Sequence, residues 1–391
     1  MTEVLSQKLI KTFRRYVPSM KKKFNGMPSL EDLKKFIATA ERIPNNILYI
    51  PVGLRWLWLG LRYRSLTLPS VSNPMIETGG FMGESKASVL DMVGDEYRNW
   101  IARYILFHRD GGSADSNFQR ALEALKIKGL EFPIVAKPDI GWNGYGVRFV
   151  ENETQLLEYL EQFPPGANLI LQEAVNYDGE AGIFYIRIPG NEKGYIYSIT
   201  LRYYPFVVGD GKSTLKQLIE NDERTKFRAH LYLGKSPKHV GFSNEDLERV
   251  PPEGELIRLA FIGSLRAGGL YRDGSHLITP ELTERFDTIA RSMPEFYYGR
   301  FDIRFDSTDL LKRGEGFKII EINGAGAEAI QAWDPNVSLM KLYSEFFRAQ
   351  SLLFKVADRN RKRGYKPATI KDFLKAIKKQ NRLVDMYPPA S

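Results

Sequence analysis

The chain of 391 residues is longer than one ordinary hydrophobic core supports, so we expect two or three domains. Its hydrophobic content of 43% and charged content of 26% indicate a soluble globular protein, and the absence of cysteine excludes disulfides and thiolate metal sites and fits a reducing compartment. A formal net charge of +9 favours acidic partners such as nucleotides, anionic lipids or nucleic acids.

The first 115 residues predict an N-terminal region of uncertain type. Residues 1–24 have the pattern of a basic amphipathic helix, for which a solvated face is favoured over contact with an anionic surface. Ser29 to Ala40 predict a second helix with Ser29 as its N-cap. We expect no signal peptide, because the N-terminus lacks a compact apolar core with a cleavage site.

Residues 47–68 are the most apolar stretch of the chain and contain Trp56 and Trp58. A membrane-spanning helix is not expected, because arginines interrupt the stretch and Pro51 and two glycines weaken it. Two interpretations remain open. The stretch is either a buried part of the N-terminal region, which we favour, or an aromatic and arginine patch that rests on a membrane.

Residues 116–205 alternate helices and strands and predict a small α+β subdomain, preceded by a helix at residues 85–92 that carries Lys86. Within this part, residues 132–150 predict a hairpin whose first strand carries Lys137. Its loop holds Gly141, Gly144 and Gly146. Glycines leave backbone amides unobstructed, so such a loop can fold over phosphates beside a lysine, although a plain surface hairpin fits equally well in isolation.

Residues 206–350 predict a larger subdomain, and residues 351–391 predict a basic, mostly helical tail. A second glycine-bearing basic loop spans residues 207–214, and residues 222–254 have the composition of an insertion or a flap. Two strands are expected at residues 299–305 and 317–322.

These two late strands carry the residues most suited to chemistry. Side chains alternate faces along a strand, so Glu321 and Asn323 share one face, as do Arg300 and Asp302. If the strands pair, three oxygen-bearing side chains meet beside arginine. Oxygen ligands with space left for phosphate and water suit magnesium rather than zinc.

The order of these motifs resembles the ATP-grasp superfamily of carboxylate–amine ligases. The motifs are the lysine strand and glycine loop, then QEAV, GRFDI and IIEIN. The likeness is greatest to D-alanine–D-alanine ligases and to the ATP-binding part of cyanophycin synthetases, and it covers about residues 85–345. It implies an α+β fold in which two subdomains grip a nucleotide, with ATP and Mg²⁺ as cofactors.

The resemblance also implies roles for single residues. Lys137 and the weaker candidate Lys86 would bind phosphates under Gly144 and Gly146. Glu173, Ala174 and Val175 would form the hinge against adenine, and Glu180 would hold the ribose hydroxyls. Asp302, Glu321 and Asn323 would hold two magnesium ions, Arg300 would stabilise the acyl-phosphate and the tetrahedral intermediate, and Lys212 would lie on a loop that closes over the nucleotide. Arg266 and Arg272 are candidate anchors for an acidic group on the substrate, by charge and position only, and His276 is a weaker substrate candidate.

The implied reaction converts a carboxylate to an acyl-phosphate, which an amine then attacks with release of phosphate. One departure concerns Asn323, which is followed by GAGAE rather than the serine, proline and glycine segment of D-alanine ligases, so D-alanine itself is in doubt as a substrate. We expect small carboxylate and amine substrates and no nucleic acid, a cytoplasmic location that includes the inner membrane face, and leave an anionic membrane surface and a homodimer open. The alternatives are a kinase of the same fold and a non-catalytic nucleotide-dependent binding protein.

Overall fold

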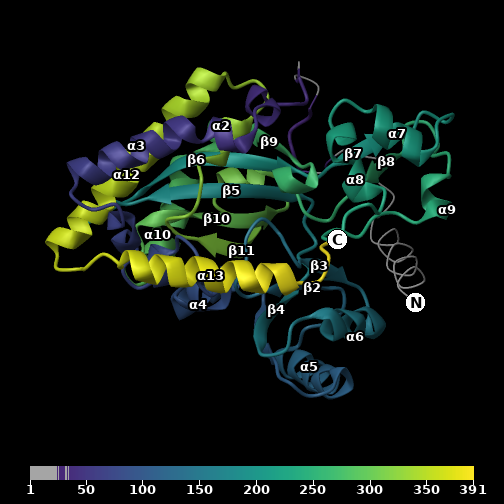
Figure 1. The fold of residues 1–391 in the computed structure, drawn as a ribbon, viewed down its shortest axis with the longest axis horizontal. Coiled ribbons are helices and arrows are strands. Elements are labelled where there is room, and N and C mark those ends of the chain that lie inside the picture. The colour runs from purple at the N-terminus through teal and green to yellow at the C-terminus, as the bar shows by residue number, and fades with distance from the viewer. Residues whose placement is uncertain (1–23, 25, 31–32, 34) are drawn as a thin grey trace.

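The computed structural model describes residues 24, 26–30, 33 and 35–391, so the basic helix expected in residues 1–24 lies outside the described residues except for Phe24. Within this part the chain is a mixture of helices and antiparallel strands arranged in separate sheets (Figure 1). The predicted α+β class is confirmed.

The large sheet has the strand order β11-β10-β5-β6-β9, with every neighbouring pair antiparallel. The strands are β5 (Gly179–Ile186), β6 (Tyr195–Tyr203), β9 (Leu270–Asp273), β10 (Tyr298–Phe305) and β11 (Phe317–Asn323). All eight residues of β5 are buried because helices cover both faces of the sheet. Ile183 and Tyr185 face the core formed with helix α10 (Pro280–Ser292), and Phe184 and Ile186 face helix α12 (Leu339–Lys362).

The small sheet has the order β1-β4-β2-β3 and is also antiparallel. Its strands are β1 (Tyr104–Arg109), β2 (Ile134–Pro138), β3 (Arg148–Val150) and β4 (Ala167–Glu173). Helices α5 (Ala114–Lys128) and α6 (Glu153–Gln162) pack on it through residues such as Leu125 and Leu156. The pairing of β2 with β3 confirms the expected hairpin.

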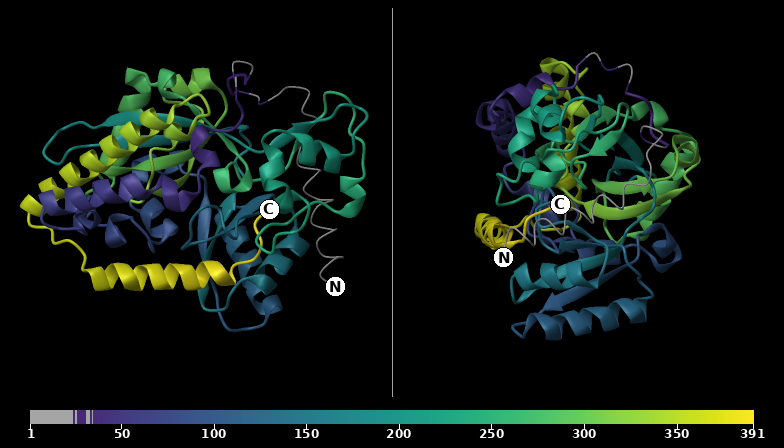
Figure 2. Two further views of the ribbon diagram at one scale, coloured as in Figure 1. Left: turned by 45° about the horizontal axis from the view of Figure 1, so that its top comes forward. Right: turned by 90° about the vertical axis from the view of Figure 1, so that its right-hand side faces the viewer.

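A third unit follows the large sheet's strand β6 along the chain. It contains the two-stranded sheet of β7 (Phe206–Val208) and β8 (Leu256–Arg258) and the helices α7 (Leu215–Asn221), α8 (Ala229–Tyr232) and α9 (Asn244–Leu247). These elements share a core that includes Leu215, Ile219 and Tyr232. Residues 222–254, expected as an insertion or flap, therefore belong to a folded unit that lies beside the small sheet (Figure 2).

Helix α13 (Ile370–Met386) and the residues after it run along the molecule and contact all three units (Figures 1 and 2). The Phe373 ring packs on Phe81 with centroids 5.8 Å apart, and Phe81 lies against the large-sheet cluster that contains Phe184 and Ile186. The Tyr387 ring stacks on Phe163 of the small-sheet core with centroids 5.4 Å apart, and Val240 N donates to Ala390 O at 2.8 Å. The C-terminal segment thus ties the sheets and the third unit together.

The N-terminal part differs from expectation in one place. The helix predicted for Ser29 to Ala40 is wrong, because the described residues before Thr39 are not helical and only a 3₁₀ turn forms at Thr39–Arg42. The apolar stretch at residues 47–68 forms α2 (Asn45–Leu48) and α3 (Ile50–Arg62), which lie against α12. Lys86 lies on α4 (Lys86–Asp91), and the remaining helix is α11 (Thr308–Lys312). No helix among the described residues is long and apolar enough to cross a membrane.

Candidate active site

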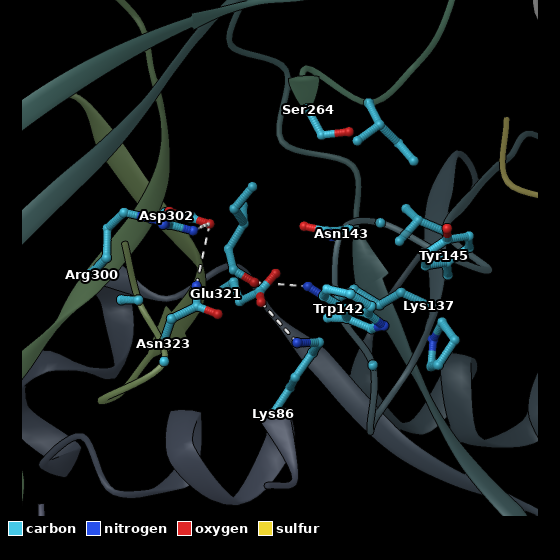
Figure 3. A pocket seen from close by; sticks show the side chains of 18 of the residues that line it. Lys86, Lys137, Trp142, Asn143, Tyr145, Ser264, Arg300, Asp302, Glu321 and Asn323 are labelled. Atoms are coloured by element: carbon cyan, nitrogen blue, oxygen red, sulfur yellow. Dashed lines mark hydrogen bonds and ion pairs between the residues drawn. The ribbon is translucent and has the colours of Figure 1, made fainter. Parts of the chain in front are cut away.

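A cavity of about 640 Å³ opens between the two sheets. Strands β2, β4, β10 and β11, the loop after β2, and α13 all contribute to its wall. The side chains that carry charge point into this space from opposite sides (Figure 3). The residues predicted as ligands of nucleotide and metal that line it are Lys86, Lys137, Gly144, Glu173, Ala174, Val175, Glu180, Arg300, Asp302, Glu321 and Asn323.

The pairing of β10 with β11 brings the predicted metal ligands together. In the register of this pair, Asp302 lies opposite Glu321 and Arg300 lies opposite Asn323, with a bulge just after Asp302. The Asn323 amide donates to Asp302 Oδ2 at 3.3 Å. A bulge re-aims side chains, and bulges are frequent next to active sites.

Two arginines hold Asp302 in place. Arg300 contacts both carboxylate oxygens, at 2.6 Å from Nε to Oδ1 and 3.0 Å from Nη2 to Oδ2. Arg202 on β6 lies 3.2 Å from Oδ2. The carboxylate is almost fully buried, and a buried carboxylate is stable only when it is paired in this way.

Glu321 is held by lysine. Lys86 Nζ donates to Glu321 Oε1 at 2.8 Å. Burial alone would raise the pKa of the Glu321 carboxyl, but Lys86 and Lys137 outweigh this effect and lower it to about 2. Burial likewise acts to lower the pKa of Lys86, and the carboxylates of Glu321 and Glu84 outweigh it and raise that pKa. Both groups are therefore charged at neutral pH.

Lys86 is positioned by a helix cap. Ser85 is the N-cap of α4, and its hydroxyl accepts from Ser88 N while donating to Asp139 Oδ1 at 2.9 Å. The same Asp139 oxygen accepts from Ala87 N at 2.9 Å. Asp139 directly follows β2, so the first turn of α4 is fixed to the strand that carries Lys137.

Lys137 is buried on β2 and donates to Gln172 Oε1 and to Ile320 O, both at 2.8 Å. Burial lowers the pKa of Lys137 to about 8, and the neighbouring carboxylates only partly offset this. The second of these hydrogen bonds joins the small sheet to β11 of the large sheet. Lys137 therefore stands where the two sheets meet.

The loop from Gly141 to Gly146 closes one side of the cavity. Gly144 has a φ of +73°, and a Cβ atom there would meet the Ile262 side chain at 2.9 Å. Gly146 also has a positive φ but is not part of the cavity wall, and its carbonyl accepts from Tyr159 at 2.9 Å. Arg266 Nε donates to Asn143 O at 2.9 Å and the guanidinium lies over Tyr145. Arg266 thus fixes the loop from outside the cavity.

The predicted hinge and ribose residues lie along the same wall. The Glu173 side chain pairs with Arg103, with Nε and Oε2 2.7 Å apart. In the predicted hinge, the backbone of Ala174 and Val175 therefore remains available to a ligand in the cavity. Glu180 pairs with Arg202 at 3.2 Å and lies 3.7 Å from Arg304.

Besides Gly146 and Arg266, three more predicted residues do not line the cavity. Lys212 is exposed in the loop after β7, and its backbone N donates to Asp210 Oδ1 at 2.9 Å. Arg272 pairs with Asp334 at 2.9 Å, and His276 is exposed.

Other cavity residues were missed by sequence reasoning. Arg202 could have been suspected, because an arginine within the otherwise apolar stretch SITLRYY needs a buried acid. Glu328 and Tyr49 carry no local signal, since they lie far apart in the chain. Ile377, Gln380 and Asn381 reach the cavity from α13, which sequence reasoning treated only as a basic tail.

Glu328 is the most unusual of these. Its carboxylate accepts from Tyr49 Oη at 2.7 Å and from Trp333 Nε1 at 3.0 Å. Burial raises the pKa of Glu328, and these donors and Arg300 only partly counter it. Its backbone oxygen lies 3.5 Å from Arg300 Nη1, so this acid stands close to the paired strands.

The donor chemistry of the cavity can be tested against magnesium. No group of three histidine, cysteine, aspartate or glutamate residues that could hold a metal occurs among the described residues, because the predicted set is two carboxylates and an amide. Magnesium is commonly bound by one or two carboxylates and completes its shell with water and phosphate oxygens. Asp302, Glu321 and Asn323 therefore fit magnesium that arrives with a nucleotide.

No protein-family model matches the chain, and no curated protein matches it. Among solved structures, one D-alanine–D-alanine ligase from Bacillus anthracis, complexed with ATP, matches at 14% identity and a TM-score of 0.39, over 74% of this chain and 70% of that one. The D-Ala:D-Ser ligase VanG from Enterococcus faecalis matches at 13% identity and a TM-score of 0.37, over 72% of this chain and 63% of that one. A bifunctional glutathione synthetase from Pasteurella multocida matches at 14% identity and a TM-score of 0.32, over 69% of this chain but only 38% of that one. The search thus returns the kind of enzyme that the sequence motifs resemble. The sequence identities and TM-scores are too low to transfer the function of these enzymes to this chain.

Proposed function

We propose that this protein is an ATP-dependent ligase that joins a carboxylate to an amine through an acyl-phosphate and releases ADP and phosphate. One observation carries the proposal. Two lysines, Lys86 and Lys137, and three oxygen ligands, Asp302, Glu321 and Asn323, converge on a single cavity between two antiparallel sheets. Cations for phosphate oxygens beside oxygen ligands for magnesium are the requirements of phosphoryl transfer from ATP.

The nucleotide would lie along the cavity wall. The backbone at Ala174 and Val175 would face the base, Glu180 would accept from the ribose hydroxyls, and Lys137 would contact the phosphates. A phosphate beside the Lys137 ammonium would favour its charged form, which burial disfavours in the free protein. Magnesium bound by Asp302, Glu321 and Asn323 would neutralise charge on the β- and γ-phosphates.

The reaction would proceed in two balanced steps. A carboxylate oxygen of the substrate attacks the γ-phosphorus and ADP leaves, which forms the acyl-phosphate. The amine nitrogen then attacks the acyl carbon, the bond from that carbon to the phosphate oxygen breaks, and phosphate departs with the proton that the nitrogen releases. Arg300 lies beside Asp302 in the cavity. Its guanidinium would face the negative charge that develops on the acyl oxygen.

Glu328 would serve the amine. A carboxylate held by Tyr49 and Trp333 has lone pairs left for an ammonium group, and its raised pKa suits it to accept the proton that the amine must lose before it attacks. We expect Glu328→Gln to raise KM for the amine at least about ten-fold, because a charge-assisted hydrogen bond is lost. KM for ATP should stay within about two-fold, and a reversed pattern would remove Glu328 from the amine site.

The proposal is tested by measuring ADP and free phosphate released from Mg·ATP across a panel of carboxylates and amines. Release of both in equal amounts, only when a carboxylate and an amine are present, is the expected result. ADP without free phosphate would instead indicate a kinase that transfers the phosphoryl group to a hydroxyl. ATP that stays intact with every pair would contradict both reactions for those substrates.

A further inference from the structure

Helix α3 presents an apolar stripe to solvent. On α3 the members Ile50, Leu54, Leu57 and Leu61 recur every three or four residues, a spacing that places them on one face of the helix, with Trp58 beside them and Ile47 preceding them on α2. The exposed fractions of these side chains run from 45% to 79%. Isolated exposed apolar side chains are ordinary, but a contiguous row of them marks an interaction surface.

The opposite face of α3 is already used. Gln350 Nε2 of α12 donates to Val52 O of α3 at 3.1 Å, and Tyr343 Oη of α12 donates to Leu48 O of the preceding α2 at 3.0 Å. The Trp56 ring packs on Phe354 with centroids 5.0 Å apart. The helix therefore has one apolar face packed against α12 and a second apolar face turned outward, which is why composition alone could not separate the buried from the exposed interpretation.

The charge around the stripe has one sign. Between Glu41 and Glu77 the chain has no acidic residue, whereas it has four arginines, at positions 42, 55, 62 and 64. The guanidinium groups of Arg55 and Arg62 lie over the Trp58 ring at 4.3 Å and 5.4 Å from its centroid. The neighbouring α12 exposes further cations at Arg348, Lys355 and Arg359, while its Lys341 pairs with Glu345 at 2.7 Å.

We propose that this stripe is a docking surface for an anionic lipid bilayer, on which α3 lies parallel to the membrane plane. Apolar side chains from such a helix enter the boundary between headgroups and acyl chains, while arginines beside them meet anionic headgroups. A tryptophan with cations on its ring suits this boundary, because its body is apolar and its edge is polar. The helix is about 20 Å long, enough to rest on the surface along its whole length.

A second copy of the chain is the less favoured occupant. A two-fold contact through the stripe would bring the same surface from each copy together. The arginines at its edge would then face each other with no acidic residue of the segment to pair with, and like charges at an interface are unfavourable. Anionic lipid supplies the missing negative charge.

The stripe is adjacent to the cavity along the chain. Tyr49 lies between Ile47 and Ile50, lines the cavity and donates to Glu328. A bilayer under α3 would therefore lie near the end of the cavity that we assign to the amine. The docking surface does not depend on that assignment, because it is argued from α3 alone.

Vesicle flotation of the full chain tests the docking surface. We expect the protein to float with vesicles of phosphatidylcholine mixed with phosphatidylglycerol, and to float at least about ten-fold less with phosphatidylcholine alone. The double variant Leu54→Ser, Leu57→Ser should lose binding to the mixed vesicles about ten-fold or more. The double variant Arg62→Glu, Arg64→Glu should lose the preference for anionic lipid.

A matched control is Ile127→Ser, because Ile127 is an exposed apolar residue on α5, away from the stripe. It should float like the unchanged protein. Binding that persists undiminished in the Leu54, Leu57 variant would place membrane contact elsewhere in the chain and overturn the proposal. Sedimentation gives the remaining outcome: a dimer that becomes a monomer in that variant, with no binding to vesicles, would assign the stripe to self-association. Thermal unfolding of the variant, measured in parallel by circular dichroism, reports folding without depending on nucleotide binding.

Discussion

Single residues in the cavity depend on one another for their charge. Glu321 pairs with Lys86, and Asp302 pairs with Arg300 and Arg202. In a buried cluster, removal of one partner leaves the others uncompensated, which commonly costs about 3–5 kcal/mol. The same cluster would meet the added charges of magnesium and phosphate, so its members are suited to a ligand that carries both signs.

The variant Glu321→Gln should lower Mg²⁺-dependent ATP turnover at least about 100-fold, because the proposed metal ligand and the partner of Lys86 are lost together. A matched control is Glu315→Gln, since Glu315 is an exposed acid just before the same strand. It should retain full turnover. Equal turnover in both variants would remove Glu321 from the metal site.

His239 gives a residue-scale prediction on pH. Burial lowers the pKa of its imidazole from 6.5 to about 4, with Arg266 adding to the effect, and neither ring nitrogen has a hydrogen-bond partner among the described residues. Between these two pH values the unfolded chain binds a proton that the folded chain does not. The free energy of unfolding should therefore fall as pH is lowered through this range, by about 3 kcal/mol from this residue.

The measurement is urea unfolding at pH 7 and pH 4.5 for the unchanged protein and for His239→Leu. Carboxylates also titrate in this range, so the difference between the two proteins is what reports the histidine. The variant should lose less stability on acidification. His276→Gln, at an exposed histidine, serves as the control and should behave like the unchanged protein. An identical loss in all three proteins would contradict the prediction.

Several cavity residues could be predicted from the sequence because the residues next to them in the chain form a recognisable pattern. Lys137 stands between an apolar run and glycines, and Asp302 and Glu321 stand within apolar strands that bury them. Arg202 and Glu328 also pair with residues far away in the chain, since Asp302 lies 100 positions from Arg202 and Tyr49 lies 279 positions from Glu328. No local pattern encodes such pairs.

At the scale of elements, the C-terminal segment holds the glycine loop. Tyr387 Oη donates to Ile140 O at 2.6 Å, and its Cβ lies 3.1 Å from the position that a Cβ on Gly146 would take. Its ring belongs to the core of the small sheet. The end of the chain therefore fixes the segment that we expect to cover the phosphates.

Tyr387→Ala should lower the free energy of unfolding by about 3–5 kcal/mol, because it removes a buried aromatic ring. Tyr387→Phe should lower it by only about 1 kcal/mol, because it removes the hydrogen bond alone. Urea unfolding measures both values. If the segment orders the loop, KM for ATP should rise more in the alanine variant than in the phenylalanine variant. Equal KM values would separate the segment from nucleotide binding.

The two late strands were predicted correctly from the alternation of their apolar residues, whereas the apolar spacing at Ser29 to Ala40 predicted a helix that does not form. The alternation of apolar and polar residues predicts strands at residues 299–305 and 317–322. Strands β10 and β11 lie at these positions. Ser29 to Ala40 have helical spacing of apolar residues, yet Leu30, Leu33 and Phe36 pack on the large-sheet core, and the described residues before Thr39 are not helical. Tertiary packing there overrode local propensity.

At the scale of the whole molecule, the cavity belongs to neither sheet alone. Lys137 comes from the small sheet and Asp302 and Glu321 come from the large one, so a ligand that contacts all three would tie the sheets together. A ligand present at 100 times its Kd stabilises a folded protein by about 2.7 kcal/mol. Mg·ATP should therefore raise the thermal unfolding temperature, and ATP with a chelator should raise it less.

The resemblance in sequence could predict this two-sheet arrangement and that Lys137, Asp302 and Glu321 meet between the sheets, because the motifs follow the chain in the order in which the strands build the cavity. It could not predict the part played by α13 or by α3. The sequence predicts a basic tail where α13 lies, and for the stretch that contains α3 it favours burial over a surface patch. Only the packing shows that α13 reaches the cavity and that α3 turns an apolar stripe outward.

Calorimetric titration of the full chain with ATP, with and without Mg²⁺, tests the central claim most directly. We predict one binding site that requires Mg²⁺ for full affinity, with binding at least about ten-fold weaker in Lys137→Ala because the charge beside the phosphates is lost. Glu321→Gln should remove the effect of Mg²⁺. Absence of any binding to the unchanged protein at millimolar ATP, or binding that neither substitution alters, would show that this cavity is not a nucleotide site.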